Sequence, residues 1–108
     1  MTKPVRFDDE AEEELMAAAI WYEKQQAGLA RSLLFAVNDA VNRIRSGPSR
    51  CTFEPSIPRA LQVRRVFVQK FPYRIIFTVL PEEVRVLAVA HDRQRPDYWR
   101  HRMTDSDC

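Results

Sequence analysis

Glycine is scarce in this chain, whose 108 residues include two glycines, Gly28 and Gly47. A phosphate-binding loop needs several closely spaced glycines, because its backbone must approach the phosphates. The sequence therefore has no such loop, and it also lacks the patterns H-E-x-x-H, C-x-x-C and G-x-S-x-G. These absences argue against a nucleotide cofactor, a zinc site and acyl transfer. We expect no cofactor and no metal.

Cysteine and long apolar runs are equally rare. The two cysteines, Cys51 and Cys108, lack the spacing of metal ligands, and we expect free thiols in a reducing compartment. The first twenty residues carry six acidic residues and no apolar core of a signal peptide. The apolar run at residues 75–80 is too short to cross a bilayer. We therefore expect a soluble, cytoplasmic protein without a membrane partner.

The overall composition is that of a globular protein, with 45% hydrophobic and 30% charged residues. A chain of this length predicts one domain spanning residues 1–108. The charge is uneven, because residues 1–26 hold three basic and seven acidic residues, whereas residues 59–108 hold ten basic and six acidic residues. This asymmetry indicates an anionic partner for one face, and an ordinary surface of mixed charge is the alternative.

The N-terminal half predicts a short strand followed by two helices. Residues 5–7 alternate between apolar and polar side chains, and Asp8 or Asp9 can cap a helix over residues 9–25. The pattern Asp9-x-x-Glu12 resembles a capping box, and Trp21 and Tyr22 extend the apolar face, so we expect them in the core. A second amphipathic helix runs from Ala30 to about Gly47. The short link between the helices predicts an antiparallel hairpin that covers a sheet.

The C-terminal half predicts three antiparallel strands, at residues 61–68, 73–79 and 84–90, after a proline-rich loop at 48–60. The last strand is almost continuously apolar, which is typical of a strand buried on both faces. The expected element order is β-α-α-β-β-β. It corresponds to an α+β domain with a helical hairpin on a mainly antiparallel four-stranded sheet. The polar tail from about residue 101 is expected to be frayed or to form a short helix.

Polar chemistry gathers where the last strand ends. Pairing about the turn at residues 80–83 places Arg74 opposite position 89 or so, and hence near His91 and Arg93. Cleavage of RNA through its 2′-hydroxyl needs a proton-transfer group and cations that stabilise the charged phosphorane. His91 suits the first role, and the two arginines suit the second. Arg65 and Arg95 are expected to bind phosphate.

Two aromatic residues after the strand, Tyr98 and Trp99, are candidates for stacking on bases. Structural roles compete with each of these functions. His91 can be a structural hydrogen-bonding group, and the two aromatics can form a packed lid over the end of the sheet. Arg74 can belong to a salt bridge with Asp92 or Asp97. The residues alone leave these alternatives open.

The sequence from Val5 to Trp99 resembles the RelE/ParE superfamily of toxins from bacterial type II toxin–antitoxin modules, often labelled plasmid stabilisation proteins. The matching segments are Phe7 with Ala11 and Leu15, residues 63–65, residues 71–77, residues 86–91, and Arg93, Arg95, Pro96, Tyr98 and Trp99. The resemblance implies two helices on an antiparallel sheet. It also implies a cognate antitoxin whose C-terminal segment wraps over the helices and sheet of the toxin.

The superfamily divides by target. RelE-like members enter the ribosome and cut messenger RNA, whereas ParE-like members poison DNA gyrase and have no known catalytic residues. In the RNase branch, the resemblance assigns phosphate contacts to Arg74 and Arg93, base stacking to Tyr98 or Trp99, and acid–base work to His91.

The strand before the hairpin separates these branches. RelE itself uses two lysines there, and this sequence has Arg65 and Phe67 at those positions. Arginine stays protonated and is a poor base, and phenylalanine has no ionisable group. We therefore favour a ParE-like toxin that inhibits gyrase by binding. A ribosome-dependent endoribonuclease is the alternative, and a non-toxic relative that only binds antitoxin is the third reading.

Overall fold

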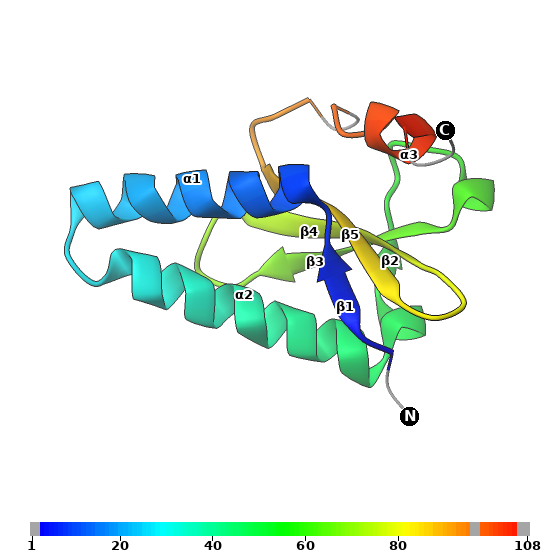
Figure 1. The fold of residues 1–108 in the computed structure, drawn as a ribbon, viewed down its shortest axis with the longest axis horizontal. Coiled ribbons are helices and arrows are strands. Elements are labelled where there is room, and N and C mark those ends of the chain that lie inside the picture. Colours follow the sequence, from blue (N-terminus) through cyan, green and yellow to red (C-terminus); the bar gives the residue numbers. More distant parts are fainter. Residues whose placement is uncertain (1–2, 96–97, 106–108) are drawn as a thin grey trace.

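The computed structural model describes residues 3–95 and 98–105, and the predicted roles of Pro96, Asp97 and Cys108 lie outside this part. Its strands are β1 (Val5–Phe7), β2 (Thr52–Phe53), β3 (Val63–Val68), β4 (Tyr73–Val79) and β5 (Val84–His91). Its helices are α1 (Asp9–Gln25), α2 (Leu29–Ser46) and α3 (His101–Asp105), with 3₁₀ turns at Pro48–Arg50 and Arg59–Leu61. Figure 1 shows α1 and α2 as a hairpin on one side of the sheet.

The sheet has five strands in the order β1-β5-β4-β3-β2, with β1 parallel to β5 and the other pairs antiparallel. The α+β class and the hairpin-on-sheet arrangement are confirmed, but the predicted count of four strands is wrong. Strand β2 was not predicted, because this two-residue segment inside the proline-rich loop is too short to show alternation of apolar and polar residues.

One strand boundary and one helix cap also differ from the prediction. Strand β3 begins at Val63 instead of residue 61, because Gln62 adopts a left-handed conformation with φ 57° after the 3₁₀ turn. Asp8 occupies the N-cap position of α1, but its side chain makes no capping bond. Its carboxylate instead accepts bonds from the guanidinium of Arg85 at 2.7–3.0 Å. The charged partner on β5 therefore takes the place of the expected cap.

A β-bulge shifts the pairing of β4 with β5. At the turn, Val79 is opposite Val84, but the register changes between Ile76 and Phe77, so Arg74 lies opposite Ala90. Directly opposed residues in a sheet point to the same face, and a slip by one residue reverses the faces. The predicted pairing of Arg74 with position 89 would require regular strands without this bulge. The bulge therefore turns His91 to the face opposite to that of Arg74.

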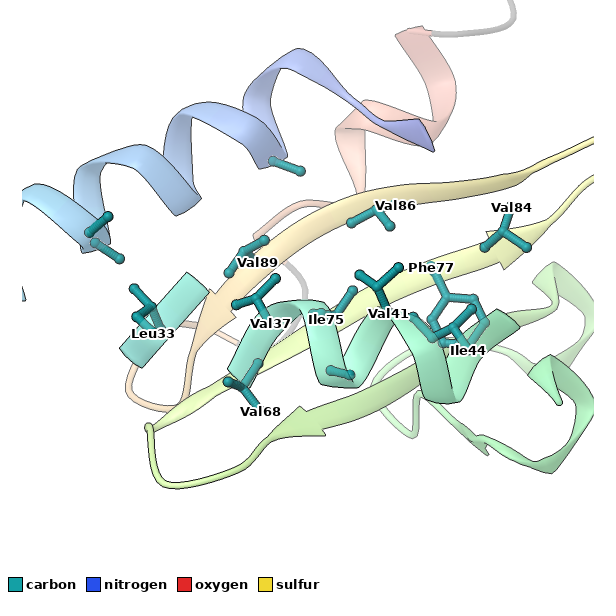
Figure 2. Packing of buried hydrophobic residues seen from close by; sticks show 14 residues of the cluster. Leu33, Val37, Val41, Ile44, Val68, Ile75, Phe77, Val84, Val86 and Val89 are labelled. Atoms are coloured by element: carbon teal, nitrogen blue, oxygen red, sulfur yellow. The ribbon is translucent and has the colours of Figure 1, made fainter. Parts of the chain in front are cut away.

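The two faces of the sheet carry separate hydrophobic clusters. On the helix face, α2 contributes Leu33, Val37, Val41 and Ile44, which point toward the strands in Figure 2. The opposite face, here called the open face, carries a smaller cluster of Ile57, Val63, Ile76, Leu87, Ala88, Ala90 and Trp99. In the predicted tail, residues 101–105 form the short helix α3, and Met103 packs against this second cluster, so the tail is not frayed throughout.

The prediction that Trp21 belongs to the core is wrong. Its side chain is 55% exposed, whereas Tyr22 is partly buried and packs against the main cluster. The two residues are neighbours on a helix, so they are rotated by about 100° from each other and cannot both face the sheet. None of the described helices is long and apolar enough to cross a membrane.

Candidate functional site

Arg74 is the centre of the predicted site, and the structure buries it. Its side chain is 8% exposed and lies on the open face, where its Nε atom is 3.6 Å from Oε1 of Glu54. A guanidinium nitrogen also lies 3.7 Å from the carboxylate of the exposed residue Asp92. The Glu54 side chain is 2% exposed, and its other oxygen accepts a bond from the backbone N–H of Ser56 at 3.0 Å. Arg74 therefore forms a buried ion pair within the protein.

His91 lies on the opposite face of the sheet, directly across from Tyr73. The two rings are in edge-to-face contact, with centroids 5.0 Å apart. Its Nδ1 atom accepts a bond from the backbone N–H of Arg93 at 3.0 Å, and the backbone N–H of His91 donates to the side-chain oxygen of Gln94 at 2.8 Å. The imidazole therefore stabilises the turn after β5. The structure does not bring it together with Arg74.

Tyr98 and Trp99 are packed into the fold. The hydroxyl of Tyr98 donates to the carboxylate of Glu14 on α1, and Trp99 is 0% exposed. Burial, together with the bond to Glu14, raises the pKa of Tyr98 well above its ordinary value. A fully buried indole presents no face on which a base can stack. The lid interpretation from the sequence therefore describes both residues.

Arg102 joins the same network. Its guanidinium donates to both oxygens of Glu14, at 3.0 and 3.1 Å, and to the carbonyl of Leu87 at 2.9 Å. Glu14 also accepts from the backbone N–H of Val89 at 3.0 Å. The pairing of β5 with β1 ends at Val86. Beyond that point, these bonds provide partners for the carbonyl of Leu87 and the backbone N–H of Val89. They also hold α3 and the preceding turn against α1.

The remaining predicted residues are more accessible. The guanidinium of Arg65 lies 5.0 Å from the ring centroid of Phe67, which is 51% exposed. Arg93 and Arg95 are exposed, and their guanidinium groups make no ion pair or hydrogen bond within the described part of the chain. These two cations are therefore free to meet a negatively charged partner.

Three residues of these networks were not predicted from the sequence: Glu54, Glu14 and Arg102. Glu54 is an isolated acid in a proline-rich loop, and Glu14 belongs to an acidic run that is typical of a solvated helix face. Arg102 stands in a polar tail. Their partners are distant in the sequence, so no local pattern indicates these contacts. Among the described residues, no group of three or more histidine, cysteine, aspartate or glutamate side chains is placed to hold a metal ion.

Comparison with known proteins identifies the family. The family model of the ParE toxin of type II toxin–antitoxin systems, parDE, matches residues 5–96. Among solved structures, a chain described as the chromosomal ParDE toxin–antitoxin system from P. aeruginosa has a similar fold, with a TM-score of 0.70 at 16% sequence identity. That match covers 83% of this chain and 96% of the other. A search of curated proteins finds no significant match.

The family model covers most of the chain, and the fold agrees with it. The partner of a toxin from such a module is an antitoxin. This chain belongs to the ParE toxin family, and it is the toxin component of a type II toxin–antitoxin system.

Proposed function

We propose that this toxin acts in the cytoplasm and inhibits DNA gyrase by binding, without a catalytic site of its own. The observation that carries the proposal is the buried pair of Arg74 with Glu54. In the alternative RNase reading, Arg74 must be open to a phosphate. Here its charge is already compensated by a carboxylate that is 2% exposed.

The positions of the other predicted residues support the same conclusion. A catalytic set must be held within hydrogen-bonding reach of one reacting group. His91 faces the helix side of the sheet, whereas Arg74 faces the open side, and Trp99 is covered. The residues of the RNase pattern therefore have no common surface at which a substrate could meet them. A binding surface needs no such convergence.

We further propose that Arg93 and Arg95 contact the target. Both lie in the segment after β5, both are exposed, and neither guanidinium has a partner in the described part of the chain. Unpaired surface cations accelerate association with an anionic partner and fix its orientation. Arg93 belongs to the same turn as His91. The backbone N–H of Arg93 donates a hydrogen bond to Nδ1 of His91, so the backbone of this turn is held in place before a target binds.

The test is gyrase inhibition by the purified toxin, measured as loss of DNA supercoiling. We expect the Arg93→Glu, Arg95→Glu double variant to need at least about tenfold more protein for half inhibition, since two favourable contacts become repulsive. The matched control is Arg45→Glu with Arg50→Glu, which makes the same change in charge at two other exposed arginines. The control should inhibit like the parent protein.

Expression in bacteria separates the alternatives. Gyrase inhibition predicts filamentous cells with induced DNA damage. Rapid arrest of translation with cut messages would support the endoribonuclease instead, provided that Arg93→Ala with Arg74→Ala abolishes the effect while circular dichroism shows that this variant is folded. Normal growth of cells that accumulate the folded protein would support the non-toxic, antitoxin-binding relative and would overturn our proposal.

A further inference from the structure

Arginine is concentrated in one part of the chain. Residues 40–67 contain six arginines, and the one acidic residue among them is Glu54, which is buried beside Arg74. Four of these arginines lie around the sheet edge where β2 pairs with β3, and they are here called the arginine cluster: Arg43, Arg59, Arg64 and Arg65. Figure 1 shows β2 near the end of the sheet where β4 and β5 are joined. The uneven charge of the sequence thus becomes a local cationic surface.

Two arginines of the cluster share one aromatic ring. The guanidinium carbons of Arg64 and Arg59 lie 3.8 and 4.5 Å from the ring centroid of Phe53 on β2. Arg64 also donates to the backbone carbonyl of Cys51 at 2.7 Å, which holds its side chain in place. Neither arginine has an ion pair within the described part of the chain. Two cations held against the same ring repel each other, and a bound anion would offset this repulsion.

Arg65 provides a third cation beside a hollow at the same edge. The hollow has a volume of about 380 Å³, and its lining includes Arg43, Arg65 and Thr52. The Nε atom of Arg65 is buried, and it has no hydrogen-bond partner among the residues that the structure describes. A buried N–H group without a partner costs free energy. An anion at this hollow would therefore gain a hydrogen bond from a donor that the protein itself leaves unused.

The rings of the cluster indicate which form of anion fits. Arginine binds phosphate through paired, charge-assisted hydrogen bonds. Proteins that bind single-stranded nucleic acids add stacking of unpaired bases on aromatic rings. The ring of Phe53 already carries two guanidinium groups, so it is poorly placed to stack on a base. A duplex encloses its bases and presents closely spaced phosphates, so it matches a surface of clustered arginines better than a single strand does.

We propose that the arginine cluster is a second contact surface of this toxin, which binds the phosphate backbone of duplex DNA without reading its sequence. The cluster adjoins the first half of β3, which pairs with the second half of β4. Arg93 and Arg95 follow the end of β5, which pairs with the start of β4. The two cationic surfaces therefore lie toward opposite ends of these strands, and the proposal does not depend on gyrase as the target.

The salt dependence of DNA binding tests the proposal. Fluorescence anisotropy of a labelled duplex of arbitrary sequence measures the affinity of the purified toxin between about 50 and 200 mM salt. Each phosphate contact contributes about 0.9 to the slope of log affinity against log salt concentration. We expect the double variant Arg59→Gln, Arg65→Gln to reduce this slope by about 2, since two contacts are lost. The affinity should fall to the same extent for duplexes of different sequence.

The matched control is Lys24→Gln with Arg31→Gln. It removes the same charge from two exposed residues at the tip of the helical hairpin, and its slope should equal that of the parent protein. Circular dichroism checks that each variant is folded. Because Arg59 is exposed, Arg59→Gln alone can replace a double variant that does not fold, and it should reduce the slope by about 1.

Three results would overturn the proposal. The first is a parent protein that does not bind the duplex even at the lowest salt concentration. The second is an equal loss of slope in the control, because binding would then follow the overall charge. The third is tighter binding of a single-stranded oligonucleotide or of polyglutamate, which would assign the cluster to stacking or to an acidic protein. None of these measurements uses gyrase, so each outcome holds whether or not the toxin inhibits that enzyme.

Discussion

At the scale of single residues, burial decides which of the predicted site residues remain available. Arg74 and Glu54 compensate each other on the open face, although Nε of Arg74 and Oε1 of Glu54 have no hydrogen-bond partner within the described part of the chain. A buried pair of this kind gains Coulomb energy but loses hydration, so its net contribution to stability is small. The loss of one partner is costly, however, because it leaves an isolated charge.

This asymmetry gives a prediction for Arg74 and Glu54. We expect Arg74→Met alone to lower the free energy of unfolding by about 3–5 kcal/mol, since the Glu54 carboxylate stays buried without its partner. The double variant Arg74→Met, Glu54→Leu should recover most of that loss. Urea denaturation measures both values. A single variant as stable as the parent protein would show that Arg74 is solvated and free for substrate.

At the scale of secondary-structure elements, the helical hairpin depends on a cap supplied from a distance. The N-cap residue of α2 is Gly28, which has no side chain that could cap the helix. Its φ of 95° is a left-handed conformation that favours glycine. The carboxylate of Glu23 instead accepts bonds from the backbone N–H groups of Gly28 and Ala30, each at 3.1 Å. These bonds lower the pKa of Glu23 below its ordinary value. A residue near the end of α1 therefore caps the start of α2.

The cap predicts a pH-dependent effect of Glu23→Ala. A carboxylate with a lowered folded pKa stabilises the protein above its unfolded pKa of about 4.3, and this contribution disappears as the pH falls through the folded pKa. We therefore expect Glu23→Ala to have a lower Tm than the parent protein at neutral pH, with the difference shrinking below about pH 4.

Glu13→Ala is the matched control for the cap. It removes an exposed glutamate from the same helix, and no hydrogen bond or ion pair of the Glu13 side chain exists in the described part of the chain. Thermal unfolding at several pH values measures both variants. An equal and pH-independent fall in Tm for the two variants would refute the capping role.

At the scale of the whole molecule, two cores enclose the sheet. The helices cover one face, while the loop that carries Ile57 and the tail that carries Trp99 cover much of the other. The network of Glu14, Tyr98 and Arg102 ties this tail to α1 and β5. The segment from Tyr98 to Asp105 is therefore part of the folded domain.

The two tryptophans give a test of this architecture. Trp99→Ala should lower the free energy of unfolding by about 3–5 kcal/mol, because it removes a fully buried indole. Trp21→Ala should change it by less than about 1 kcal/mol, since this side chain is 55% exposed. Chemical denaturation monitored by circular dichroism measures both. A stable Trp99→Ala variant would contradict the second core and would reopen the base-stacking role.

The sequence by itself determined the α+β class, both long helices, and the strands β1, β4 and β5 to within a residue. Apolar periodicity sets these features, and periodicity is a local property of the chain. It also indicated the family, through residues such as Phe7, Arg74 and Trp99, whose pattern does not depend on knowing their contacts.

Only the tertiary structure decided what the candidate site residues do. One bulge in β5 places His91 and Arg74 on opposite faces, and the hydrophobic pattern of a strand that is buried on both sides carries no sign of such a shift. Besides Asp92, which the sequence had suggested as a partner, Arg74 pairs with Glu54. Tyr98 donates to Glu14, and both of these glutamates lie far from their partners in the sequence. Long-range contacts of this kind depend on how the whole chain packs, so the sequence predicted where the polar groups gather but not which of them remain exposed.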